Sequence, residues 1–237
     1  MASLQTEGIV LQKIDYSETS LIVRLLTPEG IQSFIFQGAK RKNKKGNLIR
    51  PMAIISVEYF KRGDSELAKI RIVEPALVFK NIPYDPYKSS VLFFMNEVLI
   101  KTITEKETDN DLYTFIRSLL EILDLSTNIS NFPIKFLYQL TKYLGFYPQE
   151  EESGKYLDLQ EGKYVRYIPN HPFYLSEEKS AQLIELSGTK FDGVSDPLIP
   201  LNRRRELVYD LLKYYEVVID NFKEVQSVAV LEATFHD

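Results

Sequence analysis

Residues 8–37 read GIVLQKIDYSETSLIVRLLTPEGIQSFIFQ, and this stretch decides the fold. Its short runs are rich in β-branched and aromatic residues, and turn residues separate them. At Thr27-Pro28-Glu29-Gly30, proline presets a turn and glycine supplies backbone angles that other residues rarely adopt. The pattern continues to residue 74, with a second turn at Arg62-Gly63-Asp64. It predicts strands at 8–14, 20–27, 31–37, 53–61 and 67–74.

Five short strands in so few residues predict a closed or nearly closed barrel. The oligonucleotide-binding (OB) fold is the commonest five-stranded example. An SH3-like barrel fits the strand pattern almost as well, and the sequence leaves that choice open.

Beyond Pro75 the apolar spacing changes to that of helices, which we expect at 87–104, 111–125 and 132–144, with a long final helix at 202–222. Residues between 146 and 178 are rich in Tyr and Phe among Gly and Pro, which indicates one or two hairpins. We therefore expect an α+β multidomain protein. Its domains are a barrel at 1–80, a helical domain at 81–145 and 179–237, and a small inserted module at 146–178.

Composition excludes several classes of protein. The chain has no cysteine, so it has no disulfide, thiolate nucleophile or cysteine-ligated zinc. No apolar run is long enough to span a membrane, and the first residues lack the pattern of a secretion signal. We expect a cytoplasmic protein. The ten glycines form neither a dinucleotide-binding nor an ATP-binding motif.

Charge is unevenly distributed along the chain, whose net charge is −4. Residues 1–80 hold 13 Lys and Arg against 8 Asp and Glu, whereas the remainder holds 16 against 25. Because nucleic-acid binding depends on where the cations are, the basic barrel is the candidate binding module.

The run Lys40-Arg41-Lys42-Asn43-Lys44-Lys45 concentrates five cations between two predicted strands. Such cations repel one another unless a polyanion neutralises them, so we favour a nucleic-acid contact over a merely solvated loop. Phe34, Phe36, Tyr59 and Phe60 flank the run and could stack bases. For Phe34 and Phe36, burial in the barrel core is the preferred interpretation.

Other charged or titratable groups are weaker candidates. Arg203-Arg204-Arg205 begins the last predicted helix, where the helix dipole disfavours cations. This triplet could bind an acidic peptide or a phosphate backbone, or it could pair with nearby carboxylates, and the sequence does not decide. His171 is interpreted as a turn residue, and Glu150-Glu151-Glu152 as a solvated loop rather than a nuclease metal site.

At several places the residues resemble those of a known family, the RecO proteins. The resemblance lies in Glu7-Gly8-Ile9-Val10-Leu11, in Asp15-Tyr16-Ser17-Glu18 and in Gly38-Ala39-Lys40-Arg41. Later segments, such as Leu144-Gly145-Phe146-Tyr147-Pro148, are similar in order and spacing. The resemblance covers nearly the whole chain, and the first 45 residues carry it most specifically.

The resemblance implies an OB domain, a helical domain and an inserted zinc module. It also implies binding of single- and double-stranded DNA, strand annealing, no catalytic activity, and partnership with RecR and with the C-terminal tail of single-stranded DNA-binding protein, so that RecA is loaded. This sequence departs from the family because the four zinc-ligand cysteines, expected between Tyr147 and about Glu178, are absent. We therefore expect no zinc or other cofactor, and an insert held by its aromatic residues or by packing on neighbouring segments.

Only Lys40 and Arg41 are assigned to DNA binding by motif. Charge and position add further candidates, and the arginine triplet is assigned to the acidic tail. These further DNA-binding candidates are Lys42, Lys44, Lys45, Arg24, Arg50, Lys61 and Arg62. An RNA- or ribosome-associated OB protein, an interaction scaffold and a carboxylate-metal nuclease are the alternatives.

Overall fold

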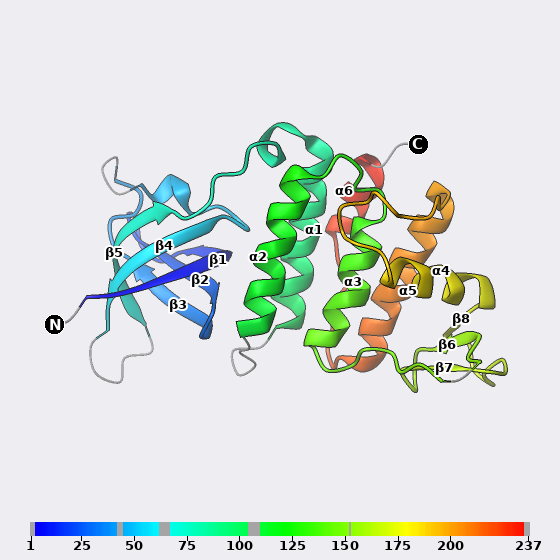
Figure 1. The fold of residues 1–237 in the computed structure, drawn as a ribbon. Helices are drawn as coiled ribbons and strands as arrows, with labels where there is room; N and C mark the ends of the chain where they lie inside the picture. The colour runs from blue at the N-terminus through cyan, green and yellow to red at the C-terminus, as the bar shows by residue number, and fades with distance from the viewer. Residues whose placement is uncertain (1–2, 42–44, 62–66, 104–109, 152, 235–237) are drawn as a thin grey trace. The chain divides into compact units, whose positions relative to one another are not determined.

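The structure is a computed structural model, and it describes residues 3–41, 45–61, 67–103, 110–151 and 153–234. The chain forms two compact units (Figure 1). The barrel unit comprises Met1–Lys80 and Ile103–Glu121, and the helical unit comprises Asn81–Thr102 and Ile122–Asp237. Within the described ranges, no helix combines the length and apolarity that crossing a membrane requires.

The barrel consists of five strands that close in the order β1-β2-β3-β5-β4. Their neighbours are antiparallel except for β3 and β5, which pair in parallel. This closed order is that of the OB fold, which decides between the two predicted barrels. The five predicted strands are confirmed, and no strand end differs from its predicted position by more than four residues. They are β1 (Leu4–Asp15), β2 (Leu21–Thr27), β3 (Gly30–Phe36), β4 (Ile54–Phe60) and β5 (Ala68–Pro75).

Alternate residues of each strand fill the barrel interior. Phe34 and Phe36 are fully buried there, so their interpretation as core residues is confirmed. Tyr59 is also a core residue and meets Phe34 edge to face, with ring centroids 5.0 Å apart. None of these three rings is therefore placed to stack bases. The predicted turn before β3 is present as well, and there the Thr27 hydroxyl donates to the Gly30 carbonyl over 2.8 Å.

Helix α2 (Asn110–Leu125) contributes most of its length to the barrel unit. Its Tyr113 hydroxyl and Arg117 guanidinium both donate to the Glu7 carboxylate of β1, over 2.6 and 2.7 Å. Burial would raise the pKa of Glu7, but these two hydrogen bonds and the Arg117 charge lower it overall. The contact joins a helix to a strand more than 100 positions away in the chain.

The helical unit contains five α-helices among its described residues. Contacts join α1 with α6, α3 with α5, and α3 with both α1 and α4. The helices predicted at 87–104 and 132–144 are confirmed, as is the one at 111–125 that forms α2. The helix expected at 202–222 is shorter and is not the last, because Ile219 is extended and α6 follows. The five are α1 (Pro86–Thr102), α3 (Phe132–Tyr143), α4 (Glu177–Ser187), α5 (Leu201–Val218) and α6 (Ser227–Thr234).

The insert is a three-stranded sheet of order β7-β6-β8, formed by β6 (Tyr156–Asp158), β7 (Lys163–Val165) and β8 (Tyr174–Leu175). Aromatic residues hold it to the helices, as expected of an insert without cysteines. The Tyr164 hydroxyl is buried 2.9 Å from that of Tyr138 on α3, and the Leu157 N–H donates to the Ser180 hydroxyl of α4.

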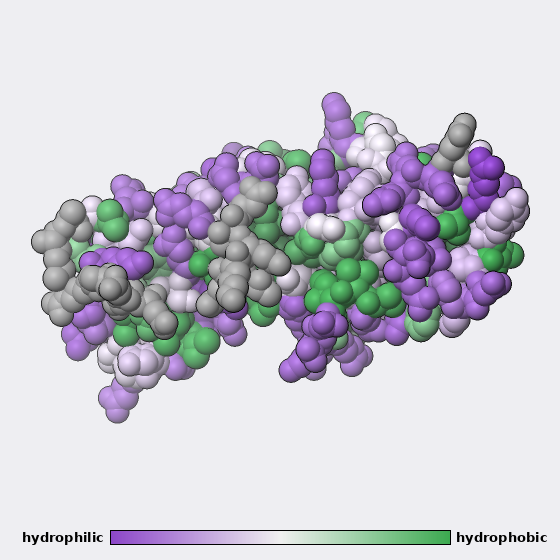
Figure 2. All heavy atoms as spheres, turned by 90° about the horizontal axis from the view of Figure 1, so that it is seen from below, coloured by the Kyte–Doolittle hydropathy of each residue, from purple (hydrophilic) through white to green (hydrophobic). Residues whose placement is uncertain are grey.

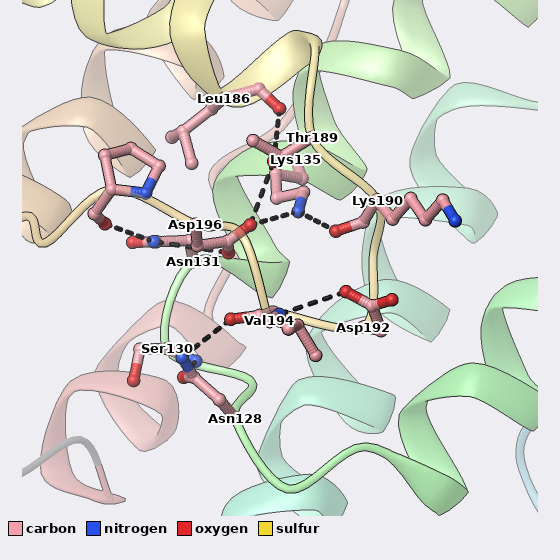
Figure 3. A network of polar contacts seen from close by, with 12 residues as sticks. Asn128, Ser130, Asn131, Lys135, Leu186, Thr189, Lys190, Asp192, Val194 and Asp196 are labelled. Carbon is pink, nitrogen blue, oxygen red and sulfur yellow. Dashed lines mark hydrogen bonds and ion pairs between the residues drawn. The ribbon is translucent and has the colours of Figure 1, made fainter.

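A buried polar network fixes the segment between α4 and α5 (Figure 3). Lys135 of α3 donates to Asp196 over 2.6 Å, and their side chains are only 2% and 4% exposed. Thr189 and Asn131 also donate to the Asp196 carboxylate. The Lys135 ammonium further contacts the Lys190 carbonyl. Removing either partner of a buried ion pair leaves the other charge uncompensated, which costs about 3–5 kcal/mol.

A carboxylate from a different helix caps α6. Glu97 of α1 accepts hydrogen bonds from the backbone N–H groups of Gln226 and Ser227, over 3.0 and 2.7 Å. Lys101 also lies 3.0 Å from this carboxylate. Burial would raise the pKa of Glu97, but the hydrogen bonds from Ser227 and Gln226 and the Lys101 ammonium lower it to about 2.

We predict that Glu97→Gln destabilises the protein by about 2 kcal/mol near neutral pH, since it removes hydrogen bonds to a charged acceptor. Because the folded pKa is depressed, Glu97 contributes its full stabilisation above the ordinary pKa of 4.5 and loses it as the pH falls toward about 2. Urea unfolding near neutral pH and near pH 3 measures this. The difference in the free energy of unfolding between parent and variant should be smaller at pH 3 than at neutral pH. A difference that stays constant contradicts the role of Glu97 as the cap of α6.

Candidate nucleic-acid interface

The cationic run follows β3 and enters a tight turn. Gly38 adopts a φ of +69°, and the Arg41 N–H donates to its carbonyl over 2.9 Å. The Lys40 N–H donates to the Thr19 carbonyl, which ties the run to the loop between β1 and β2. Lys42 and Lys44 lie outside the described residues. The run therefore starts from a fixed backbone at the end of the barrel.

Lys45 is held at the far end of the run. It precedes the 3-10 turn η1 (Gly46–Leu48) and has a φ of 55°. Gly46 packs so closely that a Cβ atom there would lie 2.2 Å from the Ala39 carbonyl oxygen. This close approach brings the start and the end of the run together, so Lys45 lies near Lys40 and Arg41.

These cations border an open groove of about 490 Å³. Four of its lining residues are cationic, whereas Asp15 is its one acidic lining residue among those described. The lining residues are Lys13, Asp15, Leu21, Ala39, Lys40, Arg41, Lys45, Gly46 and Asn47. Such a surface suits a polyanion, because a bound chain of phosphates would neutralise several cations at once.

Strand register explains why distant residues meet at this groove. Leu21 lies opposite both Asp15 and Phe36, so the β1–β2 loop and the end of β3 share one end of the barrel. Ala68 lies opposite Phe34, which brings the start of β5 to the same end. In OB folds the β1–β2 and β4–β5 loops at this end, with the adjoining face of β2 and β3, bind oligonucleotides.

Asp15 forms an ion pair with Lys40 over 2.9 Å, and the two side chains are 74% and 40% exposed. Exposed pairs of this kind contribute little to stability. The carboxylate therefore occupies a place in the groove that a phosphate oxygen could take, and an incoming polyanion has only a weak interaction to break.

The other predicted cations lie away from the groove lining. Arg50 is exposed, and its side chain donates to the Asn47 carbonyl over 3.0 Å. Arg24 points outward from β2 and is half-buried, and Lys61 is exposed just after β4. Arg62 lies outside the described residues. Conversely, the sequence prediction missed Lys13, which lies outside the cationic run, pairs with Val23 in the β1–β2 register and lines the groove.

The three arginines at 203–205 differ in their surroundings and lie at the start of α5. Arg203 forms ion pairs with Glu178 and Glu206, over 2.9 and 3.1 Å. Arg204 is buried, and Arg205 is exposed and donates to the Glu232 carbonyl over 3.3 Å. Arg204 and Arg205 line a small cavity of about 20 Å³ whose other walls include Pro133, Val208 and Leu231.

The described residues of the insert do not form a zinc site. His171 lies 3.1 Å from Asp158, whose other oxygen accepts two backbone N–H groups of the following turn. In the described ranges, no three His, Cys, Asp or Glu side chains are grouped so that they could hold a metal ion. A tetrahedral zinc site needs at least three protein ligands, so the Asp158 and His171 pair does not fit one.

Comparison with known proteins gives consistent matches along the chain. The family model "Recombination protein O N terminal" matches residues 1–79, and "Recombination protein O C terminal" matches residues 83–224. "DNA repair protein RecO" of Flavobacterium psychrophilum is 31% identical over 98% of this chain and 99% of its own length. The proteins of the same name from Flavobacterium johnsoniae and Bacteroides fragilis are 30% and 28% identical, again over 98% of this chain.

Proposed function

Since the chain belongs to the RecO family of DNA repair and recombination proteins, we propose that its basic groove binds the phosphate backbone of single- and double-stranded DNA. The observation that carries the proposal is the groove itself, where Lys13, Lys40, Arg41 and Lys45 converge at the ligand-binding end of an OB barrel. Because its relatives are named as DNA repair proteins, we set aside an RNA- or ribosome-associated role.

Binding in this groove requires no covalent step. A strand enters as its phosphates displace Asp15 from Lys40, and the cations then screen the charge of the strand. Two strands held with their charge screened can approach and pair, so annealing follows from binding. The affinity should be sequence-independent and should fall with salt, because contacts to phosphate carry no base information.

The helical unit is the proposed site for protein partners. The protein would work in the cytoplasm with RecR and with the C-terminal tail of single-stranded DNA-binding protein, and would promote RecA loading. The cavity beside Arg204 and Arg205 supports the tail as a ligand, since its apolar walls adjoin an exposed guanidinium. Arg203 is less suited to this role because two carboxylates already pair with it.

We predict that Lys40→Glu combined with Arg41→Glu lowers the affinity for single-stranded DNA at least tenfold, whatever the sequence of the strand. The reason is that two phosphate-binding charges become repulsive. Fluorescence anisotropy with labelled oligonucleotides measures the affinity. The matched control is Lys190→Glu with Lys223→Glu, which makes the same charge change at exposed positions of the helical unit. Equal losses of DNA affinity in both variants would show that the groove is not the DNA-binding site.

We also predict that Arg205→Gln weakens binding of a peptide with the sequence of the acidic tail by about tenfold, equivalent to 1.4 kcal/mol. Loss of a charge-assisted hydrogen bond accounts for this size of effect. Isothermal titration calorimetry measures it, and Arg203→Gln is the control because it removes the same charge outside the cavity lining. If the control loses as much affinity as Arg205→Gln, or Arg205→Gln loses none, the cavity is not the site.

A further inference from the structure

Three isoleucines form a row across the outer surface of the barrel. Ile14 lies opposite Ile22, and Ile22 lies opposite Ile35. Directly opposed residues point to the same face of a sheet. Val23 and Phe34, one position along, belong to the barrel core, so the isoleucine row (Ile14, Ile22 and Ile35) points away from it.

This row reaches the surface of the barrel unit. Ile14 is 48% exposed, and Ile22 and Ile35 are half-buried. Figure 2 shows hydrophobic residues among hydrophilic ones over the barrel. Apolar surface exposed to water costs about 25 cal/mol per Å², so a contiguous apolar row suggests a ligand or partner.

A second row on the outer surface provides the contrast. Ile9 lies opposite both Leu26 and Ile54, and all three are at most 1% exposed. Glu7 lies two positions before Ile9 on the same face and binds Tyr113 and Arg117 of α2. The barrel unit thus buries one outward-facing apolar row, whereas in the isoleucine row Ile14 is exposed and the other two residues are only half-buried.

Tyr16 lies next to the isoleucine row, in the β1–β2 loop. It is the first residue after β1, which ends at Asp15, and it follows Ile14 by two positions. Its side chain is 60% exposed, while its N–H donates to the Ser20 carbonyl and fixes the backbone of the β1–β2 loop. Among the aromatic residues described on the barrel, Tyr16 is the most exposed.

The surroundings of the row select an anionic ligand. Tyr16 is the neighbour of Asp15, which lines the basic groove with Lys40, and Ile35 lies opposite the exposed Lys69 at the other end of the row. A ligand that fits here has negative charge along one edge, which meets the cations, and flat apolar faces along the other edge, which meet Tyr16 and the isoleucine row. An unpaired nucleic-acid strand has that chemistry, whereas a duplex keeps the faces of its bases inside its own stack.

We propose that Tyr16 stacks on a base of an unpaired DNA strand and that the adjacent bases contact the isoleucine row, while the phosphates of the strand lie in the groove. The inference rests on the proposed DNA binding and adds to it the residue that separates single strands from duplex. The cations bind both forms through phosphate. Tyr16 acts where a base is free to stack.

The first test uses Tyr16→Trp, because the parent chain has no tryptophan. Oligothymidylate should quench the fluorescence of the introduced indole, since a stacked base contacts its ring. Duplex DNA of the same length, and an abasic strand of the same length, should leave the intensity unchanged. Tyr167→Trp is the control, since Tyr167 is 82% exposed in the helical unit. Equal quenching by oligothymidylate and by the abasic strand overturns the proposal.

The second test measures affinity. Tyr16→Ala should weaken oligothymidylate binding by about 5- to 150-fold, which corresponds to about 1–3 kcal/mol for one stacked base. Affinity for the abasic strand and for duplex should stay at the parent value, and Tyr16→Phe should restore oligothymidylate binding. Equal affinities of Tyr16→Ala and the parent overturn the stacking role.

The two proposals fail in different ways. If the parent protein binds neither oligothymidylate nor the abasic strand at low salt, DNA binding by the groove itself is wrong. If the parent binds both strands equally and Tyr16→Ala changes neither affinity, the groove proposal stands and the stacking proposal falls.

Discussion

The barrel is closed by a short parallel contact, in which Phe34 and Ile35 of β3 lie opposite Ala68 and Lys69 of β5. Because β3 and β5 run in the same direction, the end of β3 adjoins the start of β5. The β1–β2 loop already adjoins the end of β3 through Leu21. Without this closure, the start of β5 would not adjoin the end of β3, from which the cationic run continues, and the isoleucine row would lack its cationic neighbour Lys69.

The interior of the closed barrel is buried, whereas parts of its outer surface are exposed in ways that are unfavourable in water. Its core needs no further cover, since Phe34, Phe36 and their neighbours are buried inside. Its outer surface keeps a basic groove and an apolar row exposed, and both are unfavourable in water without a ligand. In the helical unit, by contrast, several charges are paired internally, such as Lys135 with Asp196 and Glu97 with Lys101. This contrast is why the barrel is assigned to DNA and the helices to proteins.

Much of the fold could be predicted from the sequence where local pattern and final structure agree. The strands and the Thr27 to Gly30 turn are of this kind, and so are α1 to α3. The short helices α4 and α6 were missed. The apolar residues Val228, Ala229, Val230 and Leu231 of α6 are consecutive rather than spaced at helical intervals, and its first turn is capped by Glu97 from another helix. Such a cap is invisible to local sequence patterns.

Only part of the candidate site could be predicted, because some of its residues come together through tertiary structure alone. Lys40, Arg41 and Lys45 are close in the chain, so their charge density is visible in the sequence. Lys13 and Tyr16 join the site through strand register and through the β1–β2 loop, which no local pattern specifies. The flanking aromatics illustrate the opposite case, because alternation along β3 places Phe34 and Phe36 inside the barrel.

The central claim is that groove cations neutralise phosphates of an unpaired DNA strand, and the salt dependence of affinity tests it most directly. If about four phosphates are neutralised, one for each cation of the groove lining, a plot of log affinity against log salt should have a slope of about −3 for single strands. The measurement uses the full chain and an oligonucleotide without secondary structure. A slope near zero, or no binding at the lowest salt, would contradict the account.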